Sequence, residues 1–125
     1  MPCALVVDDN RVILKLFEII FRRYGFDVIL SEAGEELIDK IGENAPDIAI
    51  VDLKMPGMDG DEIASLLRKN EKLKNIPIYL HTAISGLCLA NFVKPHLFDG
   101  VLIKPISQKT LDDLIMLHFG SLRVG

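Results

Sequence analysis

Residues 48–52 read Ile-Ala-Ile-Val-Asp, a short apolar run that ends in a carboxylate. Four more short apolar runs lie on either side of it in the chain of 125 residues: Ala4-Leu5-Val6-Val7, Val28-Ile29-Leu30, Ile78-Tyr79-Leu80 and Val101-Leu102-Ile103. Runs of this length, rich in β-branched residues and apolar at nearly every position, indicate strands buried on both faces of a parallel sheet.

Helical periodicity fills the segments between these runs. Asn10 can cap a helix that Gly25 ends, and its predicted core-facing stripe is Ile13, Leu16, Phe17, Ile20, Phe21 and Tyr24. Further helices are predicted over 35–41, 61–69, 85–93 and from the Ser107 cap onward. Strands that alternate with helices predict an α/β fold: a five-stranded parallel sheet with helices on both faces and right-handed crossovers.

The amino-acid composition excludes some classes of function. Half of the residues are hydrophobic, and 14 basic against 18 acidic side chains give a net charge of −4. This balance argues against nucleic acid or an anionic membrane as the main partner, because both require clustered Lys and Arg. Cys3 and Cys88 form no disulfide framework, and no signal-peptide core or membrane-spanning run is present. We therefore expect a single cytoplasmic domain without membrane insertion.

Polar side chains follow four of the predicted strands. Asp8 and Asp9 come directly after the first, Asp52 after the third, Thr82 after the fourth and Lys104 after the fifth. Ligand chemistry in parallel sheets lies at the carboxyl ends of the strands, so these side chains are expected to converge. Crowded carboxylates repel one another unless a cation lies between them, and Mg²⁺ prefers oxygen ligands of this kind. The sequence therefore predicts a magnesium site.

Four motifs stand at these strand ends: VVDDN at 6–10, IVDLKMPGMDG at 50–60, HTA at 81–83 and LIKP at 102–105. Together they resemble the receiver domain of two-component response regulators, over about residues 4–117. The resemblance implies the flavodoxin-like (βα)5 fold. It also implies that residues 1–125 are one single-domain regulator without an effector domain, as in the bacterial chemotaxis regulator.

The resemblance assigns roles to the acidic residues. Asp52 matches the phosphoacceptor, whose carboxylate takes a phosphoryl group from phosphohistidine. Asp9, Asp52 and the backbone carbonyl of Lys54 match the ligands of Mg²⁺, for which Mn²⁺ could substitute, and Asp8 matches a residue that acts through a bound water.

Three further positions match residues around the acceptor. Lys104 supplies a cation that pairs with Asp52 before transfer and with the phosphoryl group afterwards, and Thr82 is the switch hydroxyl. The small Ala83 leaves the phosphorus approachable. The bond between Lys104 and Pro105 is expected to be cis, as in the family.

The chain also departs from the family pattern. Val101 stands where many receivers carry an aromatic ring that moves with the switch hydroxyl, so we expect phosphorylation to alter the loop after Thr82 and the segment around Pro95 more than the fifth strand. Lys54 and Ile84 flank the path of the hydrolytic water, and the apolar Ile84 is expected to slow self-dephosphorylation.

The resemblance implies a phosphorylation-dependent switch or a phosphorelay intermediate, and not an enzyme with an external substrate. The implied partners are a histidine kinase or histidine phosphotransfer protein and a downstream protein target. Two alternatives stay open: a Mg²⁺-dependent phosphatase with an aspartyl nucleophile, and a constitutive binding module with a vestigial site. The phosphatase family needs Asp-x-Asp after its first strand, whereas Asp8 and Asp9 are adjacent.

Apolar residues outside the stripe of the first helix allow two interpretations. Val12, Leu14 and Ile19 are either scattered surface residues or a docking face for the helical bundle of a phosphodonor protein.

Overall fold

The computed structural model describes residues 2–53, 55, 57–83 and 94–120. Within these residues lie the strands β1 (Cys3–Val7), β2 (Asp27–Ser31), β3 (Ile48–Asp52), β4 (Ile78–Thr82) and β5 (Gly100–Ile103). The same residues form the helices α1 (Arg11–Arg23), α2 (Leu37–Ile41), α3 (Gly60–Lys69) and α4 (Gln108–Phe119), and the 3-10 turns η1 (Gly34–Glu36) and η3 (Pro95–Leu97).

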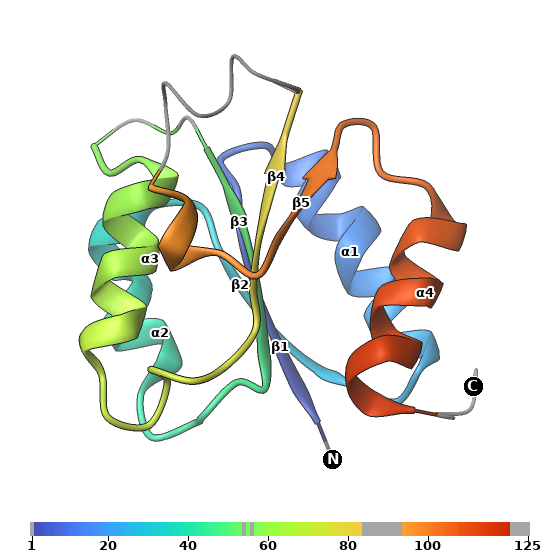
Figure 1. The fold of residues 1–125 in the computed structure, drawn as a ribbon, viewed down its shortest axis with the longest axis horizontal. Coiled ribbons are helices and arrows are strands. Elements are labelled where there is room, and N and C mark those ends of the chain that lie inside the picture. The colour runs from blue at the N-terminus through green and yellow to red at the C-terminus, as the bar shows by residue number, and fades with distance from the viewer. Residues whose placement is uncertain (1, 54, 56, 84–93, 121–125) are drawn as a thin grey trace.

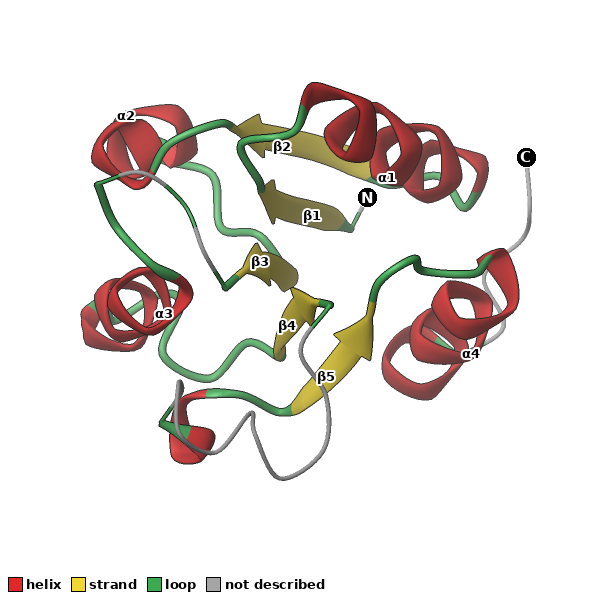
Figure 2. Cartoon of the chain, turned by 90° about the horizontal axis from the view of Figure 1, so that it is seen from above, coloured by secondary structure: helices red, strands yellow, loops and turns green. Residues whose placement is uncertain are grey.

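The strands form one parallel sheet in the order β2-β1-β3-β4-β5. Helices α1 and α4 cover one face, and α2 and α3 cover the other (Figures 1 and 2). The carboxyl ends of the strands therefore meet at one rim, with the change of strand order between β1 and β3 beside it. This architecture confirms the fold class predicted from the sequence.

The middle of the sheet is closed off from water on both faces. Every residue of β3 and β4 is buried, whereas the edge strands β2 and β5 keep exposed positions. Near-continuous apolarity in the central runs is thus explained, as predicted, by helices packing on both sides.

Helix α1 begins and ends where the sequence predicts. The Asn10 side chain accepts hydrogen bonds from the backbone N–H groups of Val12 at 2.9 Å and Ile13 at 3.2 Å. After the helix, Gly25 adopts a φ of 85°, a conformation that favours glycine, and so turns the chain towards β2.

The predicted stripe of α1 was wrong at two positions. Leu16, expected in the core, is 42% exposed, whereas Leu14, expected outside the stripe, is only 5% exposed. The large rings of Phe17 and Phe21 are fully buried and orient the helix. Leu14 lies three residues before Phe17 and seven before Phe21, so it shares their side of the helix.

The remaining helices are close to their predicted bounds. The segment predicted as 35–41 begins as η1 and continues as α2, and Gly42 ends it with a φ of 56°. Ser107 caps α4, as predicted, through a hydrogen bond from the N–H of Thr110. The predicted helix over 85–93 lies outside the described residues. Over the described part of the chain, every helix is too short or too polar to cross a lipid bilayer.

Gly60 brings α3 close to the carboxyl end of β3. Its N–H donates to the carbonyl of Leu53 at 2.8 Å, and a Cβ atom at position 60 would lie 2.8 Å from the carbonyl oxygen of Asp52. Asp59 and Glu62 cap this N-terminus of α3 reciprocally, because the side chain of each accepts a hydrogen bond from the backbone N–H of the other. A glycine is therefore needed where the helix starts against the backbone of Asp52.

Replacing Gly60 with alanine tests this close approach. We expect Gly60→Ala to lower the free energy of unfolding by about 1–3 kcal/mol, because backbone atoms would have to move to admit the methyl group. Urea titration followed by circular dichroism measures the change. Ser65→Ala, on the same helix, is the control and should cost much less. Equal stability of wild type and Gly60→Ala would contradict the account.

Candidate functional site

The polar residues singled out at the strand ends come together in one cavity. Its volume is about 370 Å³, and it is lined by Asp8, Asp9, Asn10, Asp52, Thr82, Ala83 and Lys104. Each of these residues ends a strand or directly follows one, except for Asp9 and the cap residue Asn10, which lie in the loop after β1. The parallel arrangement thus places side chains that are far apart in the sequence around one opening.

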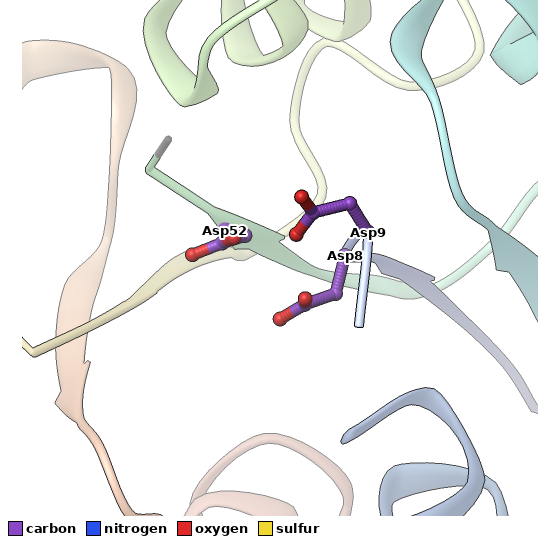
Figure 3. A group of neighbouring side chains, drawn as sticks. All are labelled: Asp8, Asp9 and Asp52. Carbon is purple, nitrogen blue, oxygen red and sulfur yellow. The ribbon is translucent and has the colours of Figure 1, made fainter. Parts of the chain in front are cut away.

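Three carboxylates form the acidic side of this cavity. Asp8, Asp9 and Asp52 each offer a carboxylate oxygen, and these oxygens all lie within 4.8 Å of one another (Figure 3). Asp8 and Asp52 are buried, whereas Asp9 is exposed. Two carboxylates therefore form the floor and the third stands at the entrance.

Local hydrogen bonds account for the different burial of the two adjacent aspartates. The N–H of Asp8 donates to the carbonyl of Ser31 at 3.0 Å and so extends the pairing of β1 with β2. Its Oδ1 accepts from the N–H of Asn10 at 2.9 Å, in a turn that leads into α1. These bonds hold Asp8 inward and leave Asp9 on the outside of the turn.

Lys104 places a cation against the carboxylates. Its Nζ donates to Asp52 Oδ1 at 3.0 Å and lies 3.8 Å from Asp8 Oδ2. Its backbone N–H donates to the carbonyl of Thr82 at 2.8 Å, which ties the end of β5 to the end of β4. The bond from Lys104 to Pro105 is cis, as the resemblance to receiver domains implied.

The electrostatic balance of the site remains negative. Burial, which is opposed by the hydrogen bond from the Asn10 N–H and by the charge of Lys104 and reinforced by the charges of Asp52 and Asp9, raises the pKa of the Asp8 carboxyl to about 6. One lysine thus faces three carboxylates within the described residues. Clustered oxygen ligands around an open cavity fit a hard divalent cation such as Mg²⁺.

Known proteins are similar to this chain in sequence. Residues 4–116 match the model of the response regulator receiver domain family. The chain belongs to this family. It is 27% identical over 117 residues to the polar-differentiation response regulator DivK of Brucella ovis, covering 94% of this chain and 95% of that protein.

Solved structures agree with the assignment. The structure of the chemotaxis protein CheY4 of Vibrio cholerae superposes with a TM-score of 0.86 at 26% identity, covering 95% of this chain and 99% of that one. The receiver domain of a sensor histidine kinase from Pseudomonas aeruginosa, described with a magnesium ion in its active-site cleft, shares the fold with a TM-score of 0.84 at 23% identity, covering 96% of this chain and 98% of that one.

The other residues to which the sequence analysis gave a role differ in their burial. Thr82 is buried at 4% exposure and lines the cavity together with the exposed Ala83. Val101 lies in the edge strand β5 and is 39% exposed. Lys54 and Ile84 lie outside the described residues, so their predicted effects on the metal and on dephosphorylation stay predictions.

His81 is part of the HTA motif, but its burial was not predicted from the sequence; it belongs to β4 and pairs with Asp52 in the sheet register. The imidazole is 2% exposed and packs edge-on against Phe17, with ring centroids 5.1 Å apart. Neither ring nitrogen has a hydrogen-bond partner among the described residues. Burial, and secondarily the charge of Lys104, lowers the pKa of His81 to about 4. The signal in the sequence was a polar residue directly after the apolar run that predicts this buried strand.

The lowered pKa predicts a pH-dependent stability. The unfolded chain protonates this imidazole near its ordinary pKa of 6.5 and the folded chain only near 4, so wild type should lose stability as the pH falls through this range. Between pH 7 and pH 5 we expect wild type to lose about 1–2 kcal/mol more than His81→Leu.

Urea titrations at the two pH values measure this difference. His96→Leu, at an exposed position, is the matched control and should keep the pH dependence of wild type. If wild type and His81→Leu lose the same stability, burial of a neutral imidazole is not the cause.

Proposed function

We propose that this receiver domain accepts a phosphoryl group from phosphohistidine on Asp52 and uses the resulting acyl phosphate as a signalling switch or as an intermediate of a phosphorelay. One observation carries the proposal. The buried Asp52 carboxylate lies 3.0 Å from the ammonium group of Lys104 and borders a cavity with an open entrance. A nucleophile and a cation for the transferred charge are thus side by side.

In the proposed transfer, a carboxylate oxygen of Asp52 attacks phosphorus. The bond between phosphorus and the donor's histidine nitrogen breaks, and the imidazole leaves with the electron pair. Lys104 then exchanges its contact with Asp52 for a phosphoryl oxygen, so the same ammonium group stabilises the site before and after the reaction. Hydrolysis of the acyl phosphate restores the starting state.

Asp9, Asp52 and the backbone carbonyl of Lys54 are the proposed ligands of Mg²⁺, or of Mn²⁺ in its place, with Asp8 acting through a bound water. The cluster of carboxylate oxygens within 4.8 Å supports this assignment. When bound, the cation neutralises charge on the phosphoryl group, which the acidic cavity otherwise repels.

Thr82 is the proposed switch residue. Its hydroxyl would bond to the phosphoryl group and draw its own loop inward, while the exposed Ala83 leaves room for that group. Val101 has no ring to follow this movement, so we propose that the response develops in the segment after Thr82 and around Pro95, and less in β5.

The phosphodonor is proposed to be a histidine kinase or a histidine phosphotransfer protein that docks on α1. Val12, Leu16 and Ile19 expose apolar surface along this helix, and together with Arg11 and Lys15 they line a groove of about 430 Å³. The helix starts directly after the cavity residue Asn10, so a helix seated in the groove brings its histidine near Asp52. A downstream protein target would read the phosphorylated state.

Incubation with Mg²⁺ and acetyl phosphate tests the acceptor. Intact-protein mass spectrometry should detect one phosphoryl adduct on wild type and none on Asp52→Asn, with Asp47→Asn, an exposed carboxylate elsewhere, as the control. Sustained turnover of a phosphate ester would instead support the phosphatase. No adduct from any donor, phosphorylated kinase included, would support a vestigial site.

Negative charge introduced at apolar positions of α1 tests the docking face. Val12→Glu with Ile19→Glu should slow transfer from phosphorylated kinases of the source organism by about tenfold or more, since the loss of about 1.4 kcal/mol of binding has that effect. Labelling by acetyl phosphate should be unchanged, because a small donor needs no docking surface. Ile38→Glu, which is 44% exposed on α2, is the control. Unchanged transfer from every active kinase would exclude this face.

A further inference from the structure

Arg68, near the end of α3, directs all of its guanidinium donors to other parts of the chain. Nε and Nη2 donate to the carbonyl of Leu97 at 3.2 and 2.9 Å, and Nη2 also donates to Asp99 Oδ2 at 3.0 Å. Nη1 donates to the carbonyls of Ile76 at 2.6 Å and Lys74 at 3.1 Å. The fixed fork of an arginine can satisfy this set of acceptors, whereas a lysine cannot.

These bonds join α3 to the segments that lead into both β4 and β5. Leu97 ends η3, which lies beside α3 in both views (Figures 1 and 2), and Asp99 directly precedes β5. Asp99 in turn pairs with the start of β4, because its N–H donates to the carbonyl of Ile78 and its Oδ2 accepts from the N–H of Ile78, both at 2.8 Å. Arg68 and Asp99 therefore fix the start of β5 against β4.

Strand β5 depends on such fixing more than the central strands do. It is an edge strand that pairs only with β4, and Val101 and Ile103 are 39% and 45% exposed, so little apolar burial holds them. At its far end the N–H of Lys104 bonds to Thr82. The register of four residues between these two fixed ends determines where the side chain of Lys104 starts.

We propose that Arg68 is a positioning residue for the phosphorylation site. Through Asp99 and Leu97 it holds the register of β5, and through β5 it holds the ammonium group of Lys104 against Asp52. The inference rests on the role proposed above for Lys104. It adds a determinant of the site at the opposite end of the sheet, whose donors all act at a distance from the reacting atoms.

A positioning role differs from a general contribution to stability in its effect on metal binding. Lys104 lies 3.0 Å from Asp52 and 3.8 Å from Asp8, so its charge opposes a cation that binds the same carboxylates. Displacing Lys104 should therefore tighten Mg²⁺ binding while slowing phosphorylation. A general loosening of the site would instead weaken Mg²⁺ binding and slow phosphorylation.

The experiment compares wild type, Arg68→Met and Lys104→Met, each alone and the two substitutions combined. Mg²⁺ affinity is measured by calorimetry without any phosphodonor, and the rate of labelling by acetyl phosphate is measured separately. Arg68→Met should bind Mg²⁺ about threefold more tightly and react about tenfold more slowly. In the Lys104→Met background it should change neither quantity. Arg22→Met, which removes an exposed pair with Glu18 on α1, is the control.

Asp99→Asn is a second variant that still tests the inference if Arg68→Met does not fold. Its side-chain oxygen can still accept from Ile78, but it no longer carries the charge that pairs with Arg68, so a smaller shift in the same directions is expected. The inference is overturned if Arg68→Met weakens Mg²⁺ binding, or if its effects persist in full without Lys104. Failure of wild type to react with any donor would instead refute the proposed function, and the Mg²⁺ affinities would still test the inference.

Discussion

The pairing of the Lys104 ammonium group with the buried carboxylates of Asp52 and Asp8 is the interaction on which the site depends. Three carboxylates within 4.8 Å of one another repel, and two of them are buried, where such repulsion is screened least. Lys104 offsets part of this charge, and in the proposed function the remainder attracts a divalent cation and through it a phosphoryl group. The same excess of negative charge that costs stability thus provides the affinity that the proposed chemistry needs.

The fold supplies the rigidity that this balance requires. The strands β3 and β4 carry Asp52 and Thr82 to the rim of the sheet, and every residue of these two strands is buried between the helices on the two faces. Gly60 lets α3 start against the backbone of Asp52. At the edge, where burial is weakest, the hydrogen bonds of Arg68 hold the strand that delivers Lys104. Tight packing thus holds the centre of the sheet in place, and individual hydrogen bonds hold its edge.

The sequence predicted the fold class and the convergence of Asp52 and Lys104, because parallel strands fix which chain ends meet. It did not predict the rotation of α1 correctly, since Leu14 and Leu16 continue two overlapping apolar patterns and only the packing of the neighbouring rings decides between them. The role of Arg68 could not be predicted either. Most of its acceptors are backbone carbonyls, which leave no pattern in the sequence.

A crystal structure of the protein with Mg²⁺ and beryllofluoride tests whether Lys104 exchanges its contact with Asp52 for the phosphoryl group. We expect the mimic on a carboxylate oxygen of Asp52, the metal between Asp9 and Asp52, and the ammonium group of Lys104 moved from Asp52 to a fluoride of the mimic. A mimic bound elsewhere, or a Lys104 that keeps its contact with Asp52 while the mimic is in place, would contradict this expectation.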